Sequence, residues 1–194
     1  MIEYKKDAFC DLLGSTGDRW HTGQLSENGE PEMTEEQRKT LLKAQQGELD
    51  GVETYLSLAQ IVNNETDRET FKALAADEGR HASVFKQYTG EVLKPDRLQA
   101  RAVVLLYRLV GKRVLYPIIA RFEYAAIPGY EELEKEFPEV ASVKNDEKRH
   151  GDTLKALLKN GEYNDRPCLP AIVCAAVSIF LLRRLFNRKN TSER

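Results

Sequence analysis

The chain has 194 residues, 31% of them charged, and its formal net charge is −2. This near balance of acidic and basic residues argues against a nucleic-acid binder, which needs a strongly basic face. The three cysteines, Cys10, Cys168 and Cys174, form no C-x-x-C pair, which excludes a zinc ribbon or a four-thiolate iron site. We expect them to be free thiols, as in a reducing compartment.

The first segment, residues 1–33, is expected to be a disordered leader. It mixes glycine, serine and asparagine without a sustained period, and it lacks the apolar core of a signal peptide. Met33 directly precedes Thr34, which is typical of a helix N-cap followed by acidic residues. Met33 is therefore an alternative start of the protein.

Residues 34–160 are predicted to form one all-α domain, a four-helix bundle. The apolar periods and the stop signals predict bundle helices over about 35–62, 66–88, 112–137 and 138–159. Thr66 is the expected cap of the second helix, and Pro138 is expected to open the fourth. Residues 98–110 are predicted to form a helical crossover, because a bundle built from two helix pairs needs one long connection between them.

The last segment differs in kind, because residues 169–182 carry no charge and a basic cluster follows them. An apolar run followed by basic residues is typical of a membrane anchor, although a full span needs about 17–20 apolar residues. We expect a C-terminal hydrophobic helix over residues 167–189 that serves as a membrane anchor, with its orientation left open. The alternative is a helix that packs on the domain or on a second subunit.

Two of the three histidines lie in the same pentapeptide, D-E-x-R-H, at residues 77–81 and 146–150. In each copy the glutamate precedes the histidine by three positions: Glu78 with His81, and Glu147 with His150. Positions i and i+3 share one face of a helix, so the carboxylate and the imidazole are directed at one point, as metal chelation demands.

Each motif also has an upstream glutamate, Glu48 before the first copy and Glu123 before the second. A tyrosine follows each glutamate by seven residues, Tyr55 in the first half and Tyr130 in the second. Seven residues are two helical turns, so each tyrosine can hydrogen-bond a carboxylate of the site. The repeated pattern predicts one site built by four helices.

Four carboxylates and two imidazoles suit iron or manganese. Four buried carboxylates would repel one another, and two divalent cations cancel this charge. Glu53 and Glu131 are less suitable donors, since Glu53 turns about 140° away from Glu48 and Glu131 belongs to a solvated charge run. The predicted metal-binding and catalytic residues are Glu48, Glu78, His81, Glu123, Glu147 and His150.

At these residues the chain resembles the rubrerythrin family. Residues 46–48 followed by Tyr55 are similar to that family's first-helix signature, and the two E-x-x-H motifs are similar to those of its second and fourth helices. Residues 123–150 are also similar to the ferritin-like domains associated with vacuolar iron transporters and to membrane-bound ferritins. The resemblance spans residues 34–159. It implies a ferritin-like fold in which the six residues bind two iron ions (Fe2+/Fe3+), with manganese as an alternative.

The implied function is that of a rubrerythrin-like di-iron oxidoreductase of the peroxidase or ferroxidase type. It would reduce peroxide or dioxygen, oxidise its bound Fe(II) and protect the cell from oxidative stress. The alternative is a membrane-associated ferroxidase or iron-binding module for iron storage or delivery. A third interpretation is a helical interaction module whose glutamates are surface charges.

The resemblance also implies partners. This sequence contains no cysteine quartet that would form a rubredoxin site, so peroxidase turnover needs an external electron donor. We expect a homodimer, as is usual for the family. We expect it in the cytoplasm, or associated with a membrane through the C-terminal helix.

Overall fold

The computed structural model describes residues 33–159, and these residues form five α-helices. The helices are α2 (Glu35–Ile61), α3 (Glu65–Thr89), α4 (Arg97–Val110), α5 (Lys112–Leu133) and α6 (Val140–Leu157). Apart from Met33, the predicted leader lies outside the described residues, and so does the predicted hydrophobic helix at 167–189. None of these five helices combines the length and the apolar character that crossing a membrane requires.

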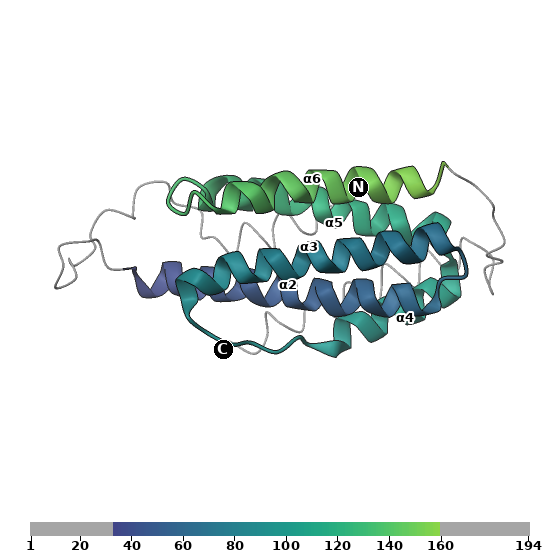
Figure 1. Cartoon of the computed structure of the whole chain (residues 1–194), viewed down its shortest axis with the longest axis horizontal. Helices are drawn as coiled ribbons and strands as arrows, with labels where there is room; N and C mark the ends of the chain where they lie inside the picture. The colour runs from purple at the N-terminus through teal and green to yellow at the C-terminus, as the bar shows by residue number, and fades with distance from the viewer. Residues whose placement is uncertain (1–32, 160–194) are drawn as a thin grey trace, which may run out of the picture.

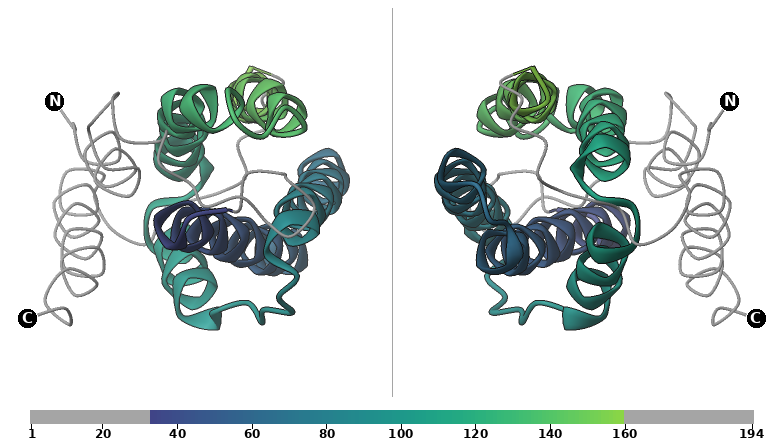
Figure 2. Two further views of the ribbon diagram at one scale, coloured as in Figure 1. Left: turned by 90° about the vertical axis from the view of Figure 1, so that its left-hand side faces the viewer. Right: turned by 90° about the vertical axis from the view of Figure 1, so that its right-hand side faces the viewer.

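Helices α2, α3, α5 and α6 form a four-helix bundle, and α4 lies outside it against α2 and α5 (Figure 2). Helices α2 and α3 form one antiparallel pair, and α5 and α6 form the other (Figure 1). Between the pairs, α4 carries the chain back along α2, so α5 runs in the same direction as α3 (Figure 1). The predicted all-α bundle with a helical crossover is confirmed.

Two helix starts show how capping residues set the boundaries. Thr34 Oγ1 accepts a hydrogen bond from the Gln37 backbone N–H at 3.2 Å, and the Gln37 side chain accepts one from the Thr34 N–H at 2.6 Å. The predicted cap of the second helix is wrong, because α3 is capped by Asn64 and not by Thr66. The Asn64 side chain accepts a hydrogen bond from the Asp67 N–H at 3.0 Å. Asparagine caps a helix at least as well as threonine, so the helix begins at the earlier residue.

The third bundle helix is shorter than predicted, since α5 ends at Leu133 and not near Phe137. Phe137 precedes Pro138, and a residue before proline is disfavoured in the α conformation. The chain turns tightly here instead, and the Glu136 N–H donates to the Leu133 carbonyl at 3.2 Å. The last bundle helix, α6, therefore begins at Val140, two residues after the proline.

Apolar side chains fill the bundle in two clusters on either side of a polar layer. One cluster includes Leu58, Phe71 and Leu154, and the other includes Leu41 and Phe85. Along α2 and α3, the residues between these clusters include carboxylates and an imidazole that are almost fully buried. Polar groups in such a layer are costly unless each finds a hydrogen-bond or metal partner.

Candidate metal centre

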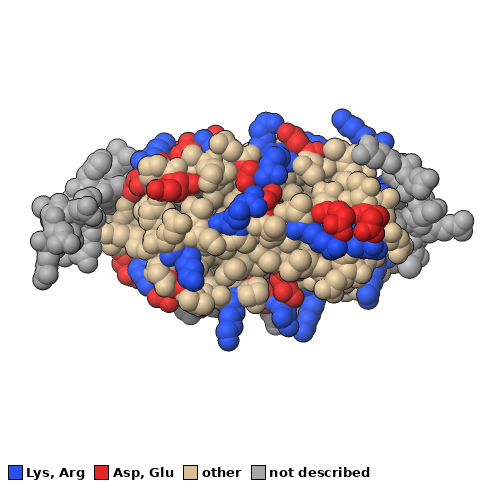
Figure 3. All heavy atoms as spheres, viewed as in Figure 1, with Lys and Arg blue, Asp and Glu red and all other residues tan. Residues whose placement is uncertain are grey.

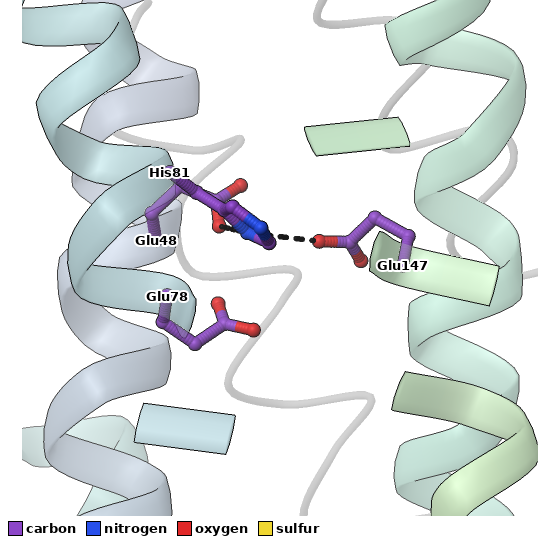
Figure 4. A group of neighbouring side chains, drawn as sticks. All are labelled: Glu48, Glu78, His81 and Glu147. Atoms are coloured by element: carbon purple, nitrogen blue, oxygen red, sulfur yellow. Dashed lines mark hydrogen bonds and ion pairs between the residues drawn. The ribbon is translucent and has the colours of Figure 1, made fainter. Parts of the chain in front are cut away.

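All six side chains that the sequence singles out converge in this polar layer. They are Glu48 of α2, Glu78 and His81 of α3, Glu123 of α5, and Glu147 and His150 of α6. Glu123 keeps 12% of its side chain exposed, and the other five residues are buried. Figure 4 shows four of them, with Glu147 reaching from α6 toward the side chains of α2 and α3. Each bundle helix thus contributes at least one donor.

The donor atoms form two groups that overlap. In each group the atoms all lie within 4.8 Å of one another, close enough to surround one metal ion. The first group consists of Glu48, Glu78, His81 and Glu147, and the second of Glu78, Glu123, Glu147 and His150. Glu78 and Glu147 belong to both groups, as expected of carboxylates that bridge neighbouring ions.

The two histidines present the same ring nitrogen to the carboxylates. His81 Nδ1 lies 3.1 Å from Glu48 Oε2 and 3.7 Å from Glu147 Oε1. His150 Nδ1 lies 3.1 Å from Glu78 Oε1 and 3.9 Å from Glu123 Oε2. The two rings stack with their centroids 5.4 Å apart. The centre therefore has an approximate twofold arrangement, one histidine for each group.

The other ring nitrogen of each histidine, Nε2, faces an aspartate that is not among the predicted site residues. His81 Nε2 lies 3.1 Å from Asp146 Oδ2, and His150 Nε2 lies 3.2 Å from Asp77 Oδ2. Each aspartate thus contacts the histidine of the other D-E-x-R-H motif. A carboxylate on the outer nitrogen fixes the ring and the tautomer of a metal-binding histidine. The sequence contains a signal for these residues, because an aspartate precedes the glutamate in both copies of the motif. Their pairing across the two motifs becomes visible only once the positions of the helices are known.

Arginines of the same motifs keep these aspartates ionised. Arg149 Nη2 lies 2.8 Å from Asp77 Oδ2 and 2.6 Å from Asp146 Oδ1, and Arg80 forms an ion pair with Asp77. Burial favours a higher pKa for both aspartates, but the hydrogen bonds from arginine and histidine outweigh it, so both pKa values are lowered. An ionised aspartate accepts a hydrogen bond from Nε2–H of the histidine, which directs Nδ1 toward the carboxylates of the centre.

Both tyrosines hydrogen-bond to a carboxylate of the site, again crosswise. Tyr55 donates its hydroxyl hydrogen to Glu123 Oε1 at 2.6 Å, and Tyr130 donates to Glu48 Oε1. Burial and the neighbouring glutamates raise the pKa of both phenols well above the usual value. Each phenol therefore stays protonated and orients the carboxylate of the other half of the repeat.

Without a cation, this cluster is electrostatically unfavourable. Burial raises the pKa of Glu147 well above its usual value, and the charges of Glu123, Glu48 and Glu78 raise it further. Burial also lowers the pKa of His150 despite the nearby Glu123 carboxylate, so this imidazole is neutral near pH 7. Its buried Nδ1 makes no hydrogen bond, because its lone pair faces the Glu78 oxygen. Two divalent cations would neutralise the carboxylates and accept this lone pair, so the donor set fits a di-metal site.

Gly51 leaves room for the side chain of Glu78, one of the two shared carboxylates. A Cβ atom added to Gly51 would lie 2.4 Å from Glu78 Oε2, whereas a Cβ added to Gly47 on the same helix would meet nothing within 4 Å. We expect Gly51→Ala to weaken metal binding, because the carboxylate must move. Gly47→Ala should only stabilise α2, by about 1 kcal/mol. Calorimetric titration with Mn(II) measures the difference, and equal affinities in the two variants would contradict this role of Gly51.

The aspartates should affect metal affinity without touching the metal. We expect Asp77→Ala and Asp146→Ala each to weaken Mn(II) binding about 10–100-fold, the range typical of carboxylates that orient a metal-bound histidine. Asp152→Ala is the control, because Asp152 lies on the same helix as Asp146 and pairs with Lys148 and Tyr124. Equilibrium dialysis of the full chain against Mn(II) measures these affinities. If the Asp77 and Asp146 variants bind as tightly as the control, the aspartates do not position the ligands.

The less suitable glutamates lie away from the centre. Glu53 forms an ion pair with Arg97 of α4 at 3.3 Å, and Glu131 is exposed on α5. Neither belongs to the two donor groups found among residues 33–159. His21, the third histidine, lies outside the described residues.

The arrangement of four carboxylates and two E-x-x-H histidines on four helices is the one known for ferritin-like di-iron carboxylate proteins. Residues 39–158 match the rubrerythrin family. Comparisons with curated proteins and with solved structures found no match. The matched range covers more than half of the 194 residues and includes every residue of both donor groups. The chain therefore belongs to the rubrerythrin family, whose members are ferritin-like di-iron proteins.

Proposed function

We propose that this protein is a di-iron oxidoreductase that reduces peroxide, and more slowly dioxygen, with electrons from two bound Fe(II) ions. The observation that supports the proposal is that Glu78 and Glu147 belong to both donor groups, so the two groups lie together in one buried layer. Reduction of a peroxide to two water molecules takes two electrons and two protons. Two Fe(II) ions held side by side by these residues would supply both electrons at one place.

The protein contributes the ligands, their orientation and a dry environment. The six proposed ligands would hold the two ions, and the carboxylates would offset their charge. Tyr55 and Tyr130 orient Glu123 and Glu48 through the hydrogen bonds described above, while Asp77 and Asp146 orient the histidines. The apolar clusters on either side of the polar layer limit the access of water. Carboxylate-rich donor sets suit both iron and manganese, so the identity of the metal is part of the proposal.

Rapid mixing of the anaerobically Fe(II)-loaded full chain with hydrogen peroxide or with dioxygen tests this function. We expect oxidation by peroxide to be the faster reaction, to consume one peroxide for every two Fe(II) ions, and to repeat when a reductant is added. Faster oxidation by dioxygen, with iron accumulating beyond two ions per chain and no reductant-dependent turnover, would contradict the proposal. That result would instead favour a ferroxidase that serves iron storage or delivery.

A further inference from the structure

The outer face of α4 carries an unusual combination of side chains. Leu98 and Leu105 are 56% and 52% exposed, and they lie seven residues apart, so they share one stripe of the helix. Arg101 and Arg108 follow the same spacing beside them, and both are exposed. We refer to these four residues as the α4 patch. It combines a small apolar surface with a border of positive charge.

Helix α4 itself contains no acidic residue that could balance this charge. Residues 97–113 contain neither aspartate nor glutamate. Arg97 pairs with Glu53 of α2, but within the described part of the chain Arg101 and Arg108 have no ion-pair partner. On the face of the bundle shown in Figure 3, by contrast, acidic and basic side chains lie side by side. The α4 patch is therefore suited to a partner that brings its own negative charge.

A chain of aromatic rings runs from the inner side of α4 to the metal centre. Tyr107, which is next to Arg108 and only 8% exposed, stacks on Tyr116 with ring centroids 6.3 Å apart. Tyr116 meets Phe71 edge to face at 5.3 Å, and Phe71 stacks on Tyr55 at 5.8 Å. Tyr55 in turn donates its hydrogen bond to Glu123 of the centre. The rings connect the α4 patch to a proposed metal ligand without a gap.

We propose that the α4 patch is the docking site of a small acidic one-electron carrier protein, and that this aromatic chain conducts the electrons inward. The inference rests on the proposed function, which requires an external reductant. Complementary charge speeds the encounter of such partners, and their interfaces are typically small. A second copy of this chain fits less well, because a twofold contact would place Arg101 and Arg108 against their own copies.

The electron balance is simple. In each encounter the carrier loses one electron and the oxidised iron pair gains one, so two encounters supply the two electrons that one peroxide consumes. No ring has to be oxidised, because the electron crosses from the carrier to the centre by tunnelling along the packed rings. The Tyr116 hydroxyl donates a hydrogen bond to Asp67 Oδ2 at 2.8 Å, which fixes this ring in the series. Asp67 is buried beside Lys112, 3.3 Å away, which holds it in place.

The docking step is tested with plant-type ferredoxin, an acidic one-electron carrier, as the probe. We expect Arg101→Glu/Arg108→Glu in the full chain to weaken ferredoxin binding at low ionic strength by at least about tenfold and to flatten its salt dependence. Arg121→Glu, which reverses one exposed charge on α5, is the control and should bind nearly normally. Binding measured with the oxidised carrier requires no turnover. Equal binding of all three proteins would overturn the assignment of the patch.

The conducting step is tested by interrupting the rings. Tyr107→Leu and Phe71→Leu should each leave ferredoxin binding unchanged and lower the limiting rate at which bound ferredoxin is oxidised, read from its own absorbance, by at least about tenfold. Iron content and helical circular dichroism show whether each variant has kept its fold; if Phe71→Leu fails this check, Tyr107→Leu alone decides. An unchanged limiting rate in a folded variant would overturn the conducting role.

Two further measurements separate this inference from its alternatives. Oxidation of the Fe(II)-loaded chain by peroxide, without a carrier, reports the proposed function alone, so its loss would refute that function and not the docking site specifically. Normal oxidation by peroxide, together with oxidation of reduced ferredoxin at a rate that the α4 variants leave unchanged, would refute the inference alone. The second measurement is binding to phosphatidylglycerol vesicles. Vesicle binding that the Arg101→Glu/Arg108→Glu variant loses, with an unchanged rate of ferredoxin oxidation, would assign the patch to a lipid surface and overturn the proposal.

Discussion

Replacing either shared glutamate, Glu78→Gln or Glu147→Gln, is expected to remove both metal ions, whereas His81→Ala or His150→Ala should remove about half of the bound metal. The reason is geometric, because each histidine belongs to one donor group and the two glutamates belong to both. A neutral amide also removes a negative charge that both cations need. Loss of a histidine leaves the second group with its donors intact.

Metal content after anaerobic loading with Fe(II) and desalting measures this difference. Glu53→Gln is the matched control, because Glu53 lies on the same helix as Glu48 but pairs with Arg97 outside the centre. We expect this control to retain the metal content of the unmodified protein. If Glu78→Gln and the two histidine variants all lose the same amount of metal, the two donor groups do not share a glutamate.

The second large effect is that of Glu147→Gln on Tm, and its sign depends on whether metal is bound. A ligand at about 1,000 times its Kd stabilises the folded state by about 4 kcal/mol. For a chain of this size each kcal/mol raises Tm by about 2–4 °C, so metal should raise Tm by about 10 °C. Glu147→Gln should abolish this increase. In the metal-free protein at pH 7 the same substitution should raise Tm by a few degrees, because it removes a buried carboxyl whose ionisation, favoured in the unfolded chain, is unfavourable in the folded one without a cation.

The pH dependence of the metal-free protein follows from the raised pKa of Glu147. Because the folded pKa lies above the unfolded one, the stability that the protonated carboxyl contributes is complete below the unfolded pKa. It is lost as pH rises through the folded value. The stabilising effect of Glu147→Gln should therefore grow between mildly acidic and neutral pH. Differential scanning calorimetry over this range, with and without Mn(II), checks both signs, and a destabilised metal-free variant at pH 7 would contradict the account.

Much of the fold could be predicted because it depends on local signals. The reciprocal hydrogen bonds at the start of α2 join Thr34 and Gln37, which lie only three residues apart. The crossover follows instead from a general rule, because two helix pairs need one long connection between them. The errors were local as well. Asn64 and Thr66 are both competent caps, and sequence alone does not rank them. The end of α5 lies well before Pro138, since proline disfavours the helical conformation of the residue before it, Phe137.

The ligands of the site could be predicted because the same pattern of residues occurs twice in the sequence. Two copies of E-x-x-H, each with an upstream glutamate, indicate which side chains share a helix face. What the repeat does not show is how its two halves combine. Tyr55 lies two turns from Glu48 on its own helix, yet it bonds Glu123 of the other half. Asp77 and Asp146 also act across the halves, and these partners depend on the packing of α3 against α6.

The central claim is that the buried layer holds two iron ions close enough to share ligands. Mössbauer spectroscopy of the full chain, loaded with isotopically enriched Fe(II) and then oxidised, tests this claim most directly. We expect two irons per chain and a spin-coupled diferric signal with a diamagnetic ground state. A single iron per chain, or isolated paramagnetic Fe(III), would contradict it.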